Sequence, residues 1–202
     1  MGLSKTDIYN NALLKVSKKL VSSPDDGTFE SKTCNALWDQ AFRRTLACHN
    51  WSSTIKRVAL DRLSTAPTTG YEYQYQLPND CVKVIRAYRS TAHDDFDFEW
   101  VTEGDALLSD ESVVYIKYVS MPTNTEGLNA HITDVLIWNL AMALCFPFTG
   151  DDNRERALRQ EFEQVVLPRA KAGDAMESRE IEWEESPWIE SLYGETPTIG
   201  TP

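Results

Sequence analysis

Residues with chemically reactive side chains are few in this 202-residue sequence, and they stand far apart. The histidines, His49, His93 and His131, have no partner at the spacing of a zinc site, so no zinc site is predicted. The four cysteines form no CxxC pair, and we expect buried, reduced thiols rather than a disulfide framework. The cysteines are Cys34, Cys48, Cys81 and Cys145.

Two acidic features could bind a divalent cation. The acidic residues from Asp94 to Glu99 alternate with aromatic residues and lack the glycine and terminal glutamate of an EF-hand loop, which favours a solvated strand face. Asp80 with Lys83 is the nearest approach to a magnesium-dependent nuclease site, but the second acid beside the lysine is missing. We therefore predict no metal site.

Motifs for nucleophilic catalysis and for nucleotide binding are also missing from the sequence. It contains no GxSxG, GxxxxGK[ST] or GxGxxG pattern, so we predict no catalytic residue and no cofactor. Tyr71, Tyr73 and Tyr75 alternate with polar residues and could stack on single-stranded nucleic acid. Because no lysine or arginine lies between these rings, packing on a sheet face is the favoured interpretation. The sequence thus points away from an enzyme.

Charge and hydropathy narrow the range of partners. The net charge is -11, which argues against a protein that wraps the nucleic-acid backbone, although an acidic wall could let DNA slide past. No apolar run approaches the length of a membrane span, and the N-terminus turns polar at once. We therefore expect no signal peptide and no membrane partner.

Hydrophobic periodicity predicts two helices at the start of the chain. The first is expected at 4–20, where Ser4 can cap it and Asp7 can complete a capping box. The second is expected at 28–49 with Thr28 as its cap. A short connection rich in turn-forming residues should leave these two helices antiparallel.

Two further helices are predicted near the other end of the chain. The segment 129–146 is apolar on nearly all sides, which is typical of a buried helix, and Pro147 and Gly150 should end it. The next helix is expected at 151–178 with a kink at Pro168. The predicted core of the helices consists of Leu37, Trp38, Phe42, Leu136, Trp138, Leu140, Leu144 and Phe162.

Between the helix pairs, alternating apolar and polar residues predict a β-rich block at 52–120. Each expected strand follows the previous one closely, so we predict antiparallel meander pairing. The expected strands are 54–60, 71–77, 82–88, 96–101, 106–108 and 113–119.

The last segment, 179–202, mixes glutamates with large apolar side chains. Such segments seldom form a core by themselves and more often dock on a partner. The candidate docking residues are Trp183, Trp188, Ile189, Leu192 and Tyr193. The partner could be a portal, a neighbouring copy or the same subunit.

The patterns together predict an α+β fold built as a four-helix bundle with an inserted antiparallel β subdomain. Residues 1–51 and 121–178 would form the bundle, residues 52–120 the insertion, and residues 179–202 an extended C-terminal docking tail.

Four stretches carry a family resemblance. They are FRRTLACHNW at 42–51, YQYQLPNDCVKV at 73–84, VYIKY at 114–118 and SPWI at 186–189. In this order and spacing they resemble the head-to-tail adaptor (connector) family of tailed bacteriophages, of the tail tubular protein A type. Asn50 stands where the family usually has proline.

The resemblance implies a structural protein of the virion rather than an enzyme. It implies a ring of about twelve copies at the head–tail junction, assembled in the host cytoplasm, with the portal on one side and tail or nozzle proteins on the other. DNA would pass through the lumen during ejection without sequence-specific binding. Two alternatives stay open: a prophage-encoded regulatory binding module of low oligomeric state, and an unrecognised hydrolase.

Overall fold

The computed structural model describes residues 2–90 and 98–177, and it is a mixed α+β structure. The helices are α1 (Lys5–Lys15), α2 (Phe29–Ala47), α3 (Ala130–Thr149), α4 (Asp152–Glu161) and α5 (Leu167–Glu177). The strands are β1 (Ile55–Ala59), β2 (Tyr73–Gln76), β3 (Cys81–Tyr88), β4 (Trp100–Glu103), β5 (Ala106–Ser109) and β6 (Tyr115–Ser120). The α+β class predicted from the sequence is confirmed.

Local capping signals set the starts of the first two helices as predicted. Asp7 N–H donates to the Ser4 hydroxyl at 3.2 Å and Ser4 N–H donates to the Asp7 carboxylate at 3.1 Å, which completes the capping box. Thr28 accepts from Ser31 N–H at 3.2 Å. The predicted end of the first helix was wrong, because α1 ends at Lys15. The chain turns at Ser17 with a φ of 57°, and Lys18 N–H donates to the Leu13 carbonyl at 3.0 Å.

The ends of α3 and α5 show how the helices accommodate proline. Asn129 caps α3, which continues through Pro147 and ends at Gly150 with a φ of 64°. Pro147 was therefore wrongly predicted to end the helix: its missing N–H removes one hydrogen bond, to the carbonyl four residues back, and the helix continues for two more residues. Near Pro168, α4 and α5 are joined by a π-helical turn, Phe162–Val166, instead of a regular α-helix.

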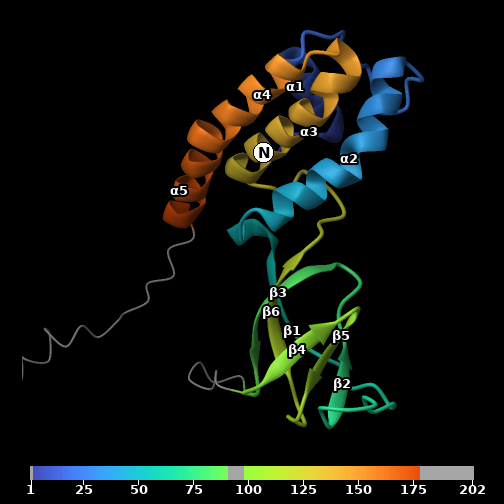
Figure 1. Cartoon of the computed structure of the whole chain (residues 1–202), viewed down its shortest axis with the longest axis vertical. Coiled ribbons are helices and arrows are strands. Elements are labelled where there is room, and N and C mark those ends of the chain that lie inside the picture. The colour runs from blue at the N-terminus through green and yellow to red at the C-terminus, as the bar shows by residue number, and fades with distance from the viewer. Residues whose placement is uncertain (1, 91–97, 178–202) are drawn as a thin grey trace, which may run out of the picture.

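Helix α3 is the centre of the helical region. It contacts α1, α2, α4 and α5, and in Figure 1 it lies between α2 and the helix formed by α4 and α5. Its length and apolar composition would suffice to cross a membrane, but most of it is buried within the protein, as in the core helix of a soluble fold. Leu37 is only partly buried at the edge of this core. The other expected core residues, Trp38, Phe42, Leu136, Trp138, Leu140, Leu144 and Phe162, are buried.

The strands form two three-stranded antiparallel sheets, in the orders β1-β6-β3 and β2-β5-β4. The predicted meander was therefore wrong, and of the described strands only β4 and β5 are both consecutive and paired, through a turn at Gly104 with a φ of 61°. Burial explains the order: β5 is buried at all positions and takes the centre of its sheet, and β6 takes the centre of the other.

The β region has a core of its own and meets the helices at one place. Its core includes Tyr75, Leu107 and Ile116, whereas Val119 at the end of β6 belongs to the helical core. Strand β1 pairs with β6, with Ile55 opposite Val119. The chain therefore leaves the helices and returns to them along neighbouring strands (Figure 1).

Candidate functional site

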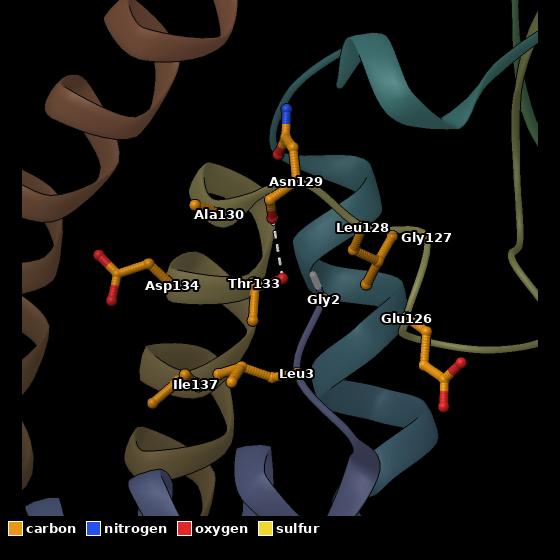
Figure 2. Close-up of a pocket in the computed structure, with 10 residues that line it drawn as sticks. All are labelled: Gly2, Leu3, Glu126, Gly127, Leu128, Asn129, Ala130, Thr133, Asp134 and Ile137. Atoms are coloured by element: carbon orange, nitrogen blue, oxygen red, sulfur yellow. Dashed lines mark hydrogen bonds between the residues drawn. The ribbon is translucent and has the colours of Figure 1, made fainter.

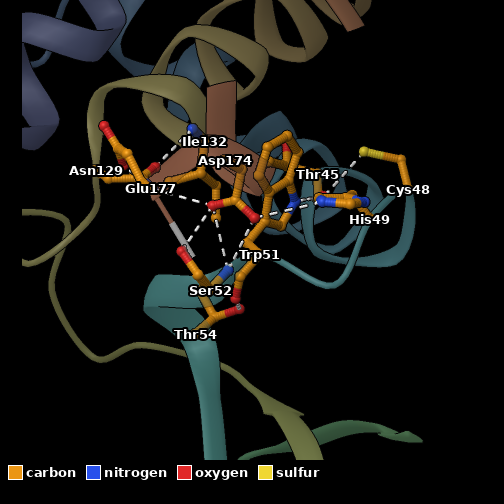
Figure 3. Close-up of polar contacts among 10 residues, drawn as sticks. All are labelled: Thr45, Cys48, His49, Trp51, Ser52, Thr54, Asn129, Ile132, Asp174 and Glu177. Atoms are coloured by element: carbon orange, nitrogen blue, oxygen red, sulfur yellow. Dashed lines mark hydrogen bonds and ion pairs between the residues drawn. The ribbon is translucent and has the colours of Figure 1, made fainter. Parts of the chain in front are cut away.

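The strongest polar cluster lies where the helices meet the β region, and a buried carboxylate is its centre. Asp174, on the last turns of α5, is only 1% exposed. Ser52 donates to it from its backbone N–H at 3.1 Å and from its hydroxyl at 2.8 Å (Figure 3). The side-chain amide of Asn129 donates to it at 3.1 Å. Asp174 thus fastens α5 to the segment before β1 and to the start of α3.

His49, just after α2, completes the environment of Asp174. Its Nε2 lies 3.3 Å from an Asp174 oxygen, and its ring meets the Trp51 ring edge-on at 4.9 Å. Burial is the largest effect on the pKa of His49 and lowers it, because it disfavours the charged imidazolium. Asp174 raises the pKa, but the positive charges of Lys171 and Lys83 lower it, so the pKa lies below its usual value. A neutral imidazole can still donate a hydrogen bond to Asp174 from Nε2.

Trp51 fixes the chain just before it leaves the helices. It is fully buried, and its indole N–H donates to the Thr45 carbonyl at 2.7 Å. The Thr45 hydroxyl accepts from the Asn139 amide at 3.0 Å, which links α2 to α3 at the same level. On the far side, the Ser120 hydroxyl donates to the Thr54 carbonyl at 2.8 Å. Both chain crossings between helices and sheets are therefore held by buried hydrogen bonds.

Asn129 and Glu177 extend the cluster to the end of α5. The side-chain oxygen of Asn129 caps α3 by accepting from Ile132 N–H at 3.1 Å, and the side-chain NH2 of Asn129 also donates to Glu177 at 3.1 Å. Glu177 lies 3.4 Å from Nε2 of His131. We call the set His49, Ser52, Asn129, Asp174 and Glu177 the Asp174 junction.

The Asp174 junction holds three segments of the chain together through hydrogen bonds that satisfy its buried groups. Within residues 2–90 and 98–177, every buried side-chain nitrogen and oxygen has a hydrogen-bond partner. In the same part of the chain no group of three or more histidines, cysteines and acids is placed to hold a metal ion. Sequence reasoning missed Asp174; its one visible signal is an isolated acid among the small residues 172–175.

Other sequence candidates are placed apart from one another. Asp80 accepts from Lys56 at 2.6 Å and from the Tyr118 hydroxyl at 3.0 Å, whereas Lys83 donates to the Ala47 carbonyl at 3.3 Å. Burial alone would raise the pKa of Asp80, but Lys56 and Tyr118 outweigh it and lower the pKa. Asp80 and Lys83 thus do not form the pair that a nuclease would need.

The aromatic row and the cysteines are also accounted for by the fold. Tyr75 is buried and donates to the Glu111 carbonyl, and the Arg62 guanidinium lies 4.9 Å from the centre of the Tyr73 ring. All four cysteines are free. Burial raises the pKa of Cys34 to about 12 and that of Cys81 to about 11, which keeps both thiols protonated.

The candidate docking residues Trp183, Trp188, Ile189, Leu192 and Tyr193 lie outside the described residues, as do His93 and most of the acidic run before Glu99. The described chain stops at Glu177, which belongs to the Asp174 junction.

A pocket of about 670 Å³ opens beside the Asp174 junction (Figure 2). Leu3, Leu128 and Ile137 supply apolar lining, and Asn129 and Asp134 are among its polar residues. The other lining residues are Gly2, Glu126, Gly127, Ala130 and Thr133.

Large apolar side chains are exposed at the end of the helices away from the sheets. Phe29, at the start of α2, is 65% exposed, Leu20 is 56% exposed, and Phe146, near the end of α3, is 52% exposed. The Phe29 ring meets Phe148 edge-on at 5.6 Å, and the Lys18 ammonium lies 5.5 Å from the centre of the Phe148 ring. We call these five residues the helical tip.

Comparison of the chain with models of known protein families and with curated proteins finds no match.

Proposed function

We propose that this chain is a structural, non-enzymatic head-to-tail adaptor of a tailed phage. It forms a ring between portal and tail, of about twelve copies as the family resemblance implies, and DNA passes through its lumen. The proposal comes from the resemblance of the four sequence stretches and from the surface described above. The observation that carries it is the helical tip.

The helical tip is the surface of an assembling protein. Phe29, Leu20 and Phe146 are each more than half exposed at one end of the helices, and Phe29 and Phe148 touch each other there. Clustered apolar side chains on a surface mark sites of protein association, because isolated proteins gain by burying them. We infer that the tip contacts the portal or a neighbouring copy.

We further propose that the helices act as one four-helix bundle carrying residues 52–120 as an insertion. Contacts between α3 and each of the other helices support this reading, and so does the pairing of β1 with β6, which closes the insertion where it began. The Asp174 junction then sets how the β subdomain is oriented on the bundle. A fixed orientation is what a ring of identical copies requires.

The passage of DNA requires a lumen that does not retain it. The net charge of -11 grows with every copy in a ring, so we expect repulsion rather than counterion-releasing contacts with the phosphates. Tight, salt-sensitive binding of duplex DNA by the purified chain would contradict this part of the proposal.

The test is the mass of the assembly in solution. Native mass spectrometry and negative-stain class averages of the chain, alone and mixed with its portal, should show a closed ring. Phe29→Glu should shift the mass distribution toward smaller species, whereas Val58→Glu, at an exposed position on β1, should leave the ring intact. A compact dimer under all conditions would instead support the regulatory module.

A further inference from the structure

The outer face of the sheet β1-β6-β3 carries a row of three basic side chains. Arg57 and Arg86 each lie opposite Lys117 in the register of the strands, so the three side chains lie side by side on one face of the sheet. Ile116, the neighbour of Lys117, belongs to the core that the two sheets share, so the face with the basic residues points away from the second sheet. Arg57 and Arg86 are exposed, and Lys117 is half-buried. We call Arg57, Arg86 and Lys117 the cation row.

The strands that carry the cation row supply no negative charge of their own. β1, β3 and β6 contain no aspartate or glutamate, and they contain two further lysines, Lys56 and Lys83. Like charges on directly opposite residues repel one another, so the row favours an anion close to it. Its members also interact within their own chain, but a guanidinium has five donor hydrogens and an ammonium has three, which is more than a single contact uses. The row is therefore suited to binding an anionic surface.

An acidic turn lies on the other sheet. β4 and β5 are joined by a turn centred on Gly104, with Glu103 and Asp105 on either side, and all three residues are exposed. The Gln76 side-chain amide donates to the Asp105 carbonyl at 3.1 Å, which holds the turn against β2. Around this turn, residues 99–114 contain five acids and no lysine or arginine. We call Glu103, Gly104 and Asp105 the acidic turn.

The cation row and the acidic turn lie on different sides of the β region. In Figure 1, β1, β3 and β6 lie to the left of β2 and β5, and the cation row faces away from the second sheet. One molecule therefore cannot join its own row to its own turn. Two molecules that make one such contact still leave one row and one turn unused, so further copies can add until a ring closes.

The two surfaces also match in size and charge. Neighbouring strands lie about 4.8 Å apart, so the cation row is about 10 Å long. Residues two positions apart in a chain lie at most about 7 Å from each other, so both carboxylates of the acidic turn can reach the row. Nucleic acid, the other polyanion, would have to approach a chain with a net charge of -11. Charge therefore favours a second copy of this chain as the partner.

We propose that the cation row of one copy binds the acidic turn of the next copy. This contact depends on the proposed ring, in which it is the surface by which neighbouring copies meet. Opposite charges select the head-to-tail orientation, because a row facing a row, or a turn facing a turn, would be repelled. The contact also covers basic side chains that DNA would otherwise reach.

Charge reversal on one surface at a time tests the contact. Arg57→Glu/Arg86→Glu should make the row repel the turn and lower the share of rings in native mass spectra at least about tenfold. Glu103→Lys/Asp105→Lys should do the same from the other side. An equal mixture of the two variants should restore rings, because each row then meets a turn of opposite charge when the variants alternate. All four changes in a single chain should restore them too.

The matched control is Asp39→Lys/Glu161→Lys, which changes the net charge as the turn variant does but at exposed positions on the helices. It should form rings as the wild type does. Circular dichroism checks that each variant is folded. If the row variant does not fold, the turn variant carries the test, because its changes lie in an exposed turn.

The outcomes separate this contact from the adaptor proposal. Wild-type rings that neither variant disrupts, or folded variants whose mixture stays disassembled, would overturn the contact and leave the adaptor proposal standing. A wild type without rings, alone and with its portal, would overturn both. Weaker binding of a fluorescent oligo-dT by the row variant, with its rings intact, would assign the cation row to nucleic acid instead.

Discussion

Removing the Asp174 carboxylate should weaken the link between the helices and the β region. In Asp174→Ala, the Ser52 N–H, the Ser52 hydroxyl and the Asn129 amide lose their common acceptor. A buried donor left unpaired costs about 1–3 kcal/mol. Water can reach partly exposed Ser52, so only part of this cost applies there, and we expect a loss of about 3 kcal/mol in the free energy of unfolding.

Urea unfolding followed by circular dichroism measures this loss. Asp39→Ala, which removes an exposed carboxylate from α2, is the matched control and should change the free energy by no more than about 0.5 kcal/mol. Amide hydrogen exchange supplies a local readout, because the Ser52 N–H should exchange faster in Asp174→Ala and not in Asp39→Ala. Equal stability of the two variants, with an unchanged Ser52 exchange rate, would refute the reasoning.

Three further predictions concern the neighbours of the Asp174 junction and the helical core. The pKa of His49 is lower in the folded protein than its usual value, so the neutral imidazole's contribution to stability is complete above about pH 6.5. That contribution is lost as the pH falls through the folded-state pKa. In urea titrations, the free energy of unfolding should therefore fall more between about pH 7.5 and about pH 5.5 in the wild type than in His49→Gln. Gly173→Ala should lower the free energy of unfolding by about 1–3 kcal/mol despite alanine's helix propensity, because the new Cβ would lie 2.2 Å from the His131 ring. Adding His131→Ala to the same chain should remove the clash and restore part of the lost stability in thermal melts. Leu136→Ala should cost about 2–5 kcal/mol in urea unfolding, whereas Leu14→Ala, at an exposed position, should cost little.

Features of the fold that depend on neighbouring residues were predictable from the sequence. Ser4 and Thr28 were identified as caps because each is a hydroxyl residue directly before a predicted helix. In both cases the backbone N–H three residues later donates to the hydroxyl, as expected. The buried helix α3 followed from its lack of a polar face. In each case the determining contacts lie within one or two turns, so a single stretch of sequence contains them.

Features that depend on distant partners were not predictable in this way. The meander prediction used only the closeness of strands along the chain, whereas the sheets are ordered by which strands can be buried on both faces. The bond between Ser52 and Asp174 joins residues 122 positions apart. His49 and His131, which have no partner nearby in the sequence, each face a carboxylate of α5. Only the packing of α5 brings these groups together.

The last turn of α5 connects three parts of the protein that are otherwise separate. Asp174 and Glu177 are three residues apart and therefore lie on one face of the helix. Through them the turn holds Ser52 before β1 and Asn129 at the start of α3, beside the pocket. A partner that binds the following segment can change the orientation of the β region only if it binds one arrangement of this turn more tightly than another. Because every buried polar group here is already paired, a rearrangement must first break these bonds, which favours one fixed orientation.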